Sequence, residues 1–128
     1  MTNNELTTWR MIGADMGLEF DELGHPFKPG QVRDGVTLEF YAGAYDWRPL
    51  DDDSDCLGLM LHYHLTVTCE REGVMVRESS GPILTMQFYS PSYPHEETVR
   101  RAVFESAAKI VRAKLARLDQ KDVPVEFE

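Results

Sequence analysis

The sequence predicts a single α+β domain, organised as a helix/antiparallel-sheet/helix sandwich. The chain has 128 residues, the size of one domain, and 42% of them are hydrophobic, which is enough for one core. Segments of helical periodicity lie on both sides of a central run of strand-like segments that turn residues separate. We therefore expect one domain over residues 1–128, with residues 18–35 as a long loop and residues 119–128 as an extended tail.

A first helix is expected from Asn4 to Met16. Its apolar side chains recur on one face of a 3.6-residue period, and either Asn3 or Asn4 can cap its start. Gly17 provides a stop at the end of the helix. Turn-forming pairs that contain Gly and Pro follow, which predicts a surface loop.

The central strands are expected to form an antiparallel sheet of about four members. Residues 36–41 are β-branched and aromatic, and residues 65–71 alternate between apolar and polar side chains. Residues 72–73 make a tight turn, and residues 74–78 and 83–89 provide two further strands.

Two more helices are expected over residues 52–63 and 95–118. The first begins with carboxylates, which cap free N–H groups and meet the positive end of the helix dipole. Gly58 weakens this helix unless it permits close packing. The second has acidic residues in its first turn, basic residues near its end and a broad apolar stripe, and it is the strongest helix in the chain.

The charge balance excludes one class of function and indicates another. The chain carries 22 acidic and 13 basic residues, and its formal net charge of −9 is the opposite of what electrostatic nucleic-acid binding needs. Residues 1–56 hold 12 acids and 4 bases, whereas residues 57–128 hold 10 acids and 9 bases. An acidic surface attracts basic partners. Because no long apolar run predicts a membrane span and no export signal is found, we expect a cytoplasmic protein.

A distinctive segment links the expected strand over residues 36–41 to the expected helix over residues 52–63: Tyr45-Asp46-Trp47-Arg48-Pro49-Leu50-Asp51-Asp52-Asp53-Ser54-Asp55-Cys56-Leu57. With the strand pair and the closing helix around residues 100–110, it resembles the phage ABA sandwich domain family, small proteins of bacteriophages and prophages. The resemblance covers residues 45–115 and implies a helix–sheet–helix sandwich. It implies no chemistry, since the members are mostly of unknown function, and no catalytic residue is transferred. Independently of the family, Trp47 and Leu50 are expected to be buried beside the sheet.

The aspartates of this segment do not form a known metal loop. Read as a calcium loop, Asp51-x-Asp53-x-Asp55 places Cys56 where a Gly is required and His62 where a Glu is required. Capping of the helix and a solvated acidic face explain the cluster more simply.

The other reactive residue types also have structural interpretations. His62-x-His64 lacks the Glu of a zinc protease motif, and Cys56 and Cys69 match no zinc signature. Both cysteines are expected to be buried thiols. We therefore expect no metal, no cofactor and no catalytic residue. A set of aromatic residues is expected in the core or at its edge: Tyr41, Tyr45, Trp47, Phe88, Tyr89 and Tyr93.

The expected function is that of a non-enzymatic phage or prophage accessory protein that binds a host macromolecule. Its acidic surface would occupy the basic, nucleic-acid-binding surface of a host protein, as an anti-CRISPR inhibitor of a defence system does; no nucleic acid or membrane is bound directly. Solubility is the simpler explanation of the charge. The expected contact residues are four aspartates, with three acidic residues in support: Asp51, Asp52, Asp53, Asp55, Glu19, Asp21 and Glu22.

Two alternatives stay open at this point. One is a small-ligand or metal-binding enzyme with a pocket at the sheet edge, lined by His62, His64 and Tyr93. The other is a homo-oligomeric assembly protein with the long C-terminal helix in its interface.

Overall fold

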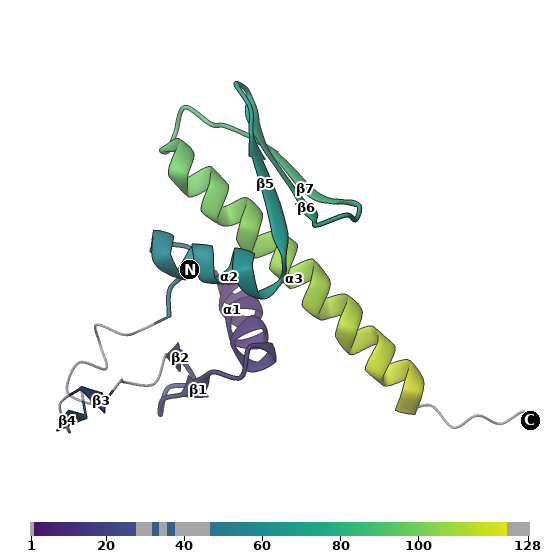
Figure 1. The fold of residues 1–128 in the computed structure, drawn as a ribbon. Helices are drawn as coiled ribbons and strands as arrows, with labels where there is room; N and C mark the ends of the chain where they lie inside the picture. The colour runs from purple at the N-terminus through teal and green to yellow at the C-terminus, as the bar shows by residue number, and fades with distance from the viewer. Residues whose placement is uncertain (1, 28–31, 34–35, 38–46, 123–128) are drawn as a thin grey trace, which may run out of the picture.

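The computed structural model describes residues 2–27, 32–33, 36–37 and 47–122, with side chains for residues 2–27 and 47–118. Within these residues, three helices and a three-stranded antiparallel sheet are accompanied by two short strand pairs (Figure 1). The predicted class, a single α+β domain with an antiparallel sheet, is confirmed. None of the described helices is long and apolar enough to cross a membrane.

The three helices are α1 (Asn3–Asp15), α2 (Asp53–His62) and α3 (His95–Asp122). The expected cap at Asn3 or Asn4 is wrong, because Thr2 and Glu5 form a capping box instead. The Thr2 hydroxyl accepts from the Glu5 N–H at 3.1 Å, and the Glu5 carboxylate accepts from the Thr2 N–H at 2.9 Å. The extended tail expected from residue 119 is also wrong over residues 119–122, which continue α3, and the rest of it lies outside the described residues.

The main sheet has the order β5-β6-β7, formed by β5 (Leu65–Cys69), β6 (Gly73–Glu78) and β7 (Ile83–Phe88). These strands confirm the expected antiparallel meander.

The described part of the expected fourth strand does not join this sheet. Of residues 36–41, only β4 (Val36–Thr37) is described, and it pairs with β3 (Val32–Arg33). A second short pair joins β1 (Glu19–Phe20) to β2 (Pro26–Phe27). Residues 18–35 were expected as a long surface loop with room for a short strand, and β1, β2 and β3 all lie within this segment. Such pairs need only a turn between them, whereas joining the main sheet needs a free edge and a matching apolar face.

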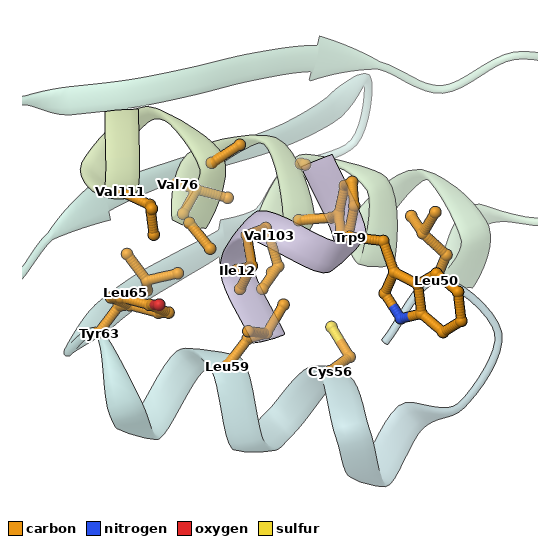
Figure 2. Close-up of a cluster of buried hydrophobic side chains, with 14 of the residues drawn as sticks. Trp9, Ile12, Leu50, Cys56, Leu59, Tyr63, Leu65, Val76, Val103 and Val111 are labelled. Atoms are coloured by element: carbon orange, nitrogen blue, oxygen red, sulfur yellow. The ribbon is translucent and has the colours of Figure 1, made fainter. Parts of the chain in front are cut away.

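Helix α3 forms the centre of the core (Figure 1). Its middle turns are buried around most of the helix, and Val103 is fully buried. Figure 2 shows Ile12 of α1, Leu59 of α2 and Val76 of β6 converging on this region. The small side chains on α3 let neighbouring backbones approach closely. The buried apolar residues of α3 are Ala102, Val103, Phe104, Ala107, Ala108 and Val111.

The order of the layers differs from the expected sandwich, although the fold class is as predicted. Val74 and Val76 of β6 point into the core, whereas Met86 and Phe88 of the neighbouring strand lie on the opposite face and are largely exposed. The described helices therefore lie on one side of the sheet. Helix α3 is the middle layer, between the sheet and the pair formed by α1 and α2 (Figure 1).

Gly13 fits α1 closely against β2. A Cβ at this position would lie 2.7 Å from the Cβ of the buried Pro26. We expect Gly13→Ala to lower the free energy of unfolding by about 1–3 kcal/mol, because the extra methyl group forces the two elements apart. Gly58, in the middle of α2, is the matched control, since nothing lies within 4 Å of a Cβ there. Gly58→Ala should raise the free energy of unfolding by about 0.5–1 kcal/mol through helix propensity. Urea unfolding of both variants checks this, and two effects of the same sign would contradict it.

Candidate functional site

The turn that precedes α2 is held by the aspartates that follow it. Asp52 caps the helix, its carboxylate accepting from the Ser54 N–H at 2.9 Å. Asp55 is buried, and its Oδ2 accepts from the backbone N–H of Arg48 at 2.8 Å. Asp55 was expected on the contact surface, and this expectation is wrong because the carboxylate turns inward to satisfy a backbone donor.

The same turn is tied to the other two helices. Trp9 of α1 donates its indole N–H to the Trp47 carbonyl at 2.8 Å. Arg100 of α3 donates to the Leu50 carbonyl at 2.8 Å and pairs with Asp53 at 2.6 Å. Trp47 and Leu50 are both buried, as predicted. The turn therefore sets the position of the start of α2 relative to α1 and α3.

Acidic side chains from the starts of all three helices gather at this end of the molecule. Arg101 of α3 joins them, pairing with Glu5 of α1 at 2.9 Å and with Glu97 at 3.5 Å. Asp51 lines a hollow of about 100 Å³ with Glu5, Leu50 and Arg101. The hydrogen bond from the Thr2 N–H and the nearby Arg101 hold the pKa of Glu5 below its usual range. We call this surface the acidic end; its carboxylates are Glu5, Asp51, Asp52, Asp53, Glu96 and Glu97.

A groove of about 340 Å³ runs between α2 and α3 beside the acidic end. Its floor is apolar, and Leu57 on its wall is half exposed. Cys56 lies beneath it, and burial raises the pKa of this thiol to about 11, so it stays protonated at neutral pH and is a poor nucleophile. Cys69, in contrast, is exposed, which corrects the prediction that both cysteines are buried. The groove is lined by Asp53, Cys56, Leu57, Met60, Glu96, Val99 and Arg100.

The three supporting residues lie elsewhere. Glu19, Asp21 and Glu22 belong to β1 and the turn after it, and the Asp21 carboxylate accepts from the Leu23 and His25 N–H groups at 2.9 Å each. This strand pair packs beside Gly13, whereas Glu5 lies eight residues earlier on the same helix, about 12 Å away at 1.5 Å per residue. The structure therefore brings Asp51, Asp52 and Asp53 together with Glu96 rather than with these three.

Within the described residues, His62 and His64 contact other groups than metal ligands. His62 contacts Tyr63 edge-on, with ring centroids 4.7 Å apart, and the His64 carbonyl accepts from Ser79. Neither of the two hollows above is lined by His62, His64 or Tyr93. Over the part of the chain that the structure describes, no group of three or more His, Cys, Asp or Glu side chains is placed to hold an ion. The alternative pocket thus gains no geometric support.

A cluster of titratable groups where α1 and α2 end was not predicted. The Tyr63 hydroxyl donates to Asp15 at 2.7 Å, and Lys114 pairs with Asp15 at 2.9 Å. Burial would raise the pKa of Asp15, but these two partners outweigh it and lower the pKa below its usual value. Burial and the Asp15 carboxylate raise the pKa of the Tyr63 hydroxyl. Because the three groups come from α1, from the residue after α2 and from α3, the cluster joins the helices.

No family model, curated protein or solved structure matches the chain. The resemblance to the phage ABA sandwich domain family therefore stays a prediction, and the function has to be argued from the geometry of the molecule.

Asp15→Asn should lower the free energy of unfolding by about 1–3 kcal/mol at pH 7, because Lys114 loses its charged partner. The pKa of Asp15 is lower in the folded chain than in the unfolded chain. Its contribution is therefore present above the unfolded pKa of about 4 and is lost as the pH falls through the folded value. Urea unfolding at several pH values should show the difference between wild type and variant shrinking in acid. Asp51→Asn, an exposed control, should change stability by less than about 0.5 kcal/mol. A difference that persists at low pH would contradict the assignment.

Proposed function

We propose that this chain is a non-enzymatic binding protein that takes a basic surface of another macromolecule on its acidic end and the adjoining α2–α3 groove. The observation that carries the proposal is the meeting of exposed carboxylates with an apolar floor. Asp53 and Glu96 line the groove together with Leu57, whose apolar side chain is half exposed. Such a combination is typical of protein-binding surfaces, in which an apolar centre is surrounded by a charged rim.

The charge at this end favours a basic partner. Asp51 and Asp52 are exposed beside the groove, and the starts of three helices add the positive ends of their dipoles beneath the carboxylates. Arg100 and Arg101 are already engaged by carboxylates of this chain. What faces solvent is therefore predominantly carboxylate, which attracts Lys and Arg and repels phosphate.

The family resemblance provides the biological setting for this proposal. In that setting the chain is a phage or prophage accessory protein, and its partner is a host protein whose basic surface holds nucleic acid. Occupation of that surface would block nucleic-acid binding, as an anti-CRISPR inhibitor of host defence does, in the bacterial cytoplasm. The acidic end supports the proposal that the partner has a basic surface, whereas the phage or prophage setting rests on the resemblance alone.

Charge reversal tests the proposal. The double variant Asp51→Lys, Glu96→Lys should lower affinity for the partner about tenfold or more, since two favourable charge contacts become repulsive. The measurement is affinity capture from bacterial lysate at low and high salt, followed by titration of the captured protein. We expect a basic partner that wild type retains at low salt and that high salt releases.

The matched control is Glu22→Lys, Glu105→Lys, which changes the net charge equally on exposed residues away from the acidic end. It should retain the partner. Thermal unfolding should show both double variants folded, because all four side chains are exposed. Equal loss of binding in the two double variants, or a partner that is not basic, would contradict the assignment of the acidic end.

A further inference from the structure

The face of the sheet that points away from the helices carries large apolar side chains in solvent. Ile83, Met86 and Phe88 of β7 are 51%, 65% and 72% exposed. Phe88 was expected in the core or at its edge, and this expectation is wrong because its position in the register places it on the outer face. Met75 lies opposite Met86, and with Phe88 they provide the apolar part of a hollow of about 210 Å³ that Glu70 and Glu72 also line. An apolar surface of this kind indicates an interface.

Strand β7 is also an edge of the sheet. The Tyr89 N–H donates to the Glu72 carbonyl at 3.0 Å. The backbone N–H and C=O groups of every second residue of β7, counted back from Tyr89, therefore face β6. It follows that the N–H and C=O groups of Met86 and Phe88 point away from the sheet. Lys109 of α3 donates to the carbonyl of Leu84, so that part of the edge is already covered.

The edge lacks the charges that usually prevent strand pairing. Although 27% of the chain is charged, residues 79–94 contain no Asp, Glu, Lys or Arg. Natural proteins generally protect exposed edges with charged side chains, prolines or bulges. Here a bulge lies beside Leu84, near the start of β7, and the half of the strand that contains Met86 and Phe88 is regular.

We propose that β7 pairs antiparallel with β7 of a second copy of this chain, with Gln87 on the two-fold axis. In this register Met86 of each copy lies opposite Phe88 of the other, and both residues use their outward backbone groups. Their side chains then form apolar cross-strand pairs on the outer face. The register leaves the Leu84 carbonyl to Lys109 and joins the two sheets into one of six strands.

A second copy fits this edge better than a charged partner does. Two chains of net charge −9 repel each other over most of their surface, so their association is favoured where acidic residues are few, and residues 79–94 contain none. A two-fold axis gives the edge a matching row of backbone groups and the same apolar side chains. A single strand pair buries less than the roughly 800 Å² per partner of a stable interface, so the dimer is reversible and depends on concentration.

Sedimentation equilibrium tests the dimer. The wild-type chain should pass from monomer to dimer as its concentration rises from about 10 μM to 1 mM, the range expected for a weak interface. Met86→Lys, Phe88→Lys should stay monomeric, because like charges would face each other across the axis. Thr68→Lys places the same charge on the same face at the β5 edge and should dimerise like wild type. A wild-type chain that stays monomeric throughout overturns the proposal and leaves the β7 edge for a strand of a different protein.

Disulfide trapping tests the register, in a Cys69→Ser background that removes the exposed native thiol. Gln87→Cys should form a disulfide-linked dimer under mild oxidation, because a pair on the axis of this register has Cα atoms about 4.5 Å apart, within disulfide reach. Thr68→Cys, on the exposed part of β5, should stay monomeric under the same conditions. Trapping at Thr68, or a dimer that Gln87→Cys does not trap, overturns this pairing. Neither experiment depends on the acidic end, so a result against the dimer leaves the proposed function untouched, and the reverse also holds.

Discussion

The whole domain depends on burying one helix around most of its circumference. The sheet packs on one side of helix α3, and α1 and α2 pack on the other side. Each of these elements therefore buries its apolar side chains against α3. Close packing on several sides requires small residues, and Ala102, Ala107 and Ala108 meet this requirement. Phe104 and Val103 then fill the larger spaces between layers.

Helix α3 also balances much of the charge of the first half of the chain. Its basic residues Arg101 and Lys114 pair with Glu5 and Asp15 of α1, and Arg100 pairs with Asp53 of α2. Part of the contrast between an acidic first half and a nearly neutral second half is thus an internal complementarity. Only the carboxylates left after pairing and capping are available to a partner, and they are concentrated where the helices begin.

The two surfaces proposed for binding differ in chemistry and in position. The acidic end lies where the helices start and combines charge with a narrow apolar groove, which suits a partner of opposite charge. Strand β7 contains no charged residue, and its exposed side chains Met86 and Phe88 lie on the face of the sheet that points away from the helices. Because the surfaces do not overlap, a chain paired through β7 would still present its acidic end, and two such ends in one dimer would strengthen binding to a repeated or extended partner.

The sequence by itself determined what depends on near neighbours: the helical periods, the presence of a hairpin turn between β5 and β6, the buried stripe of α3 and the aspartate cap of α2. The turn itself lies at residues 71–72 rather than at the predicted 72–73, because Gly73 already begins β6. The sequence predicted an acidic surface at the start of α2 but not that Asp55 turns inward, because the donor it satisfies is a backbone N–H that gives no signal in the pattern of side chains. Tertiary structure alone decided which face of the sheet is covered, since alternation marks two faces without saying which one meets a helix. Only the tertiary structure placed Tyr63 against Asp15, 48 residues away, and Glu96 beside the aspartates of α2. Contacts between such distant segments depend on how the layers stack around α3.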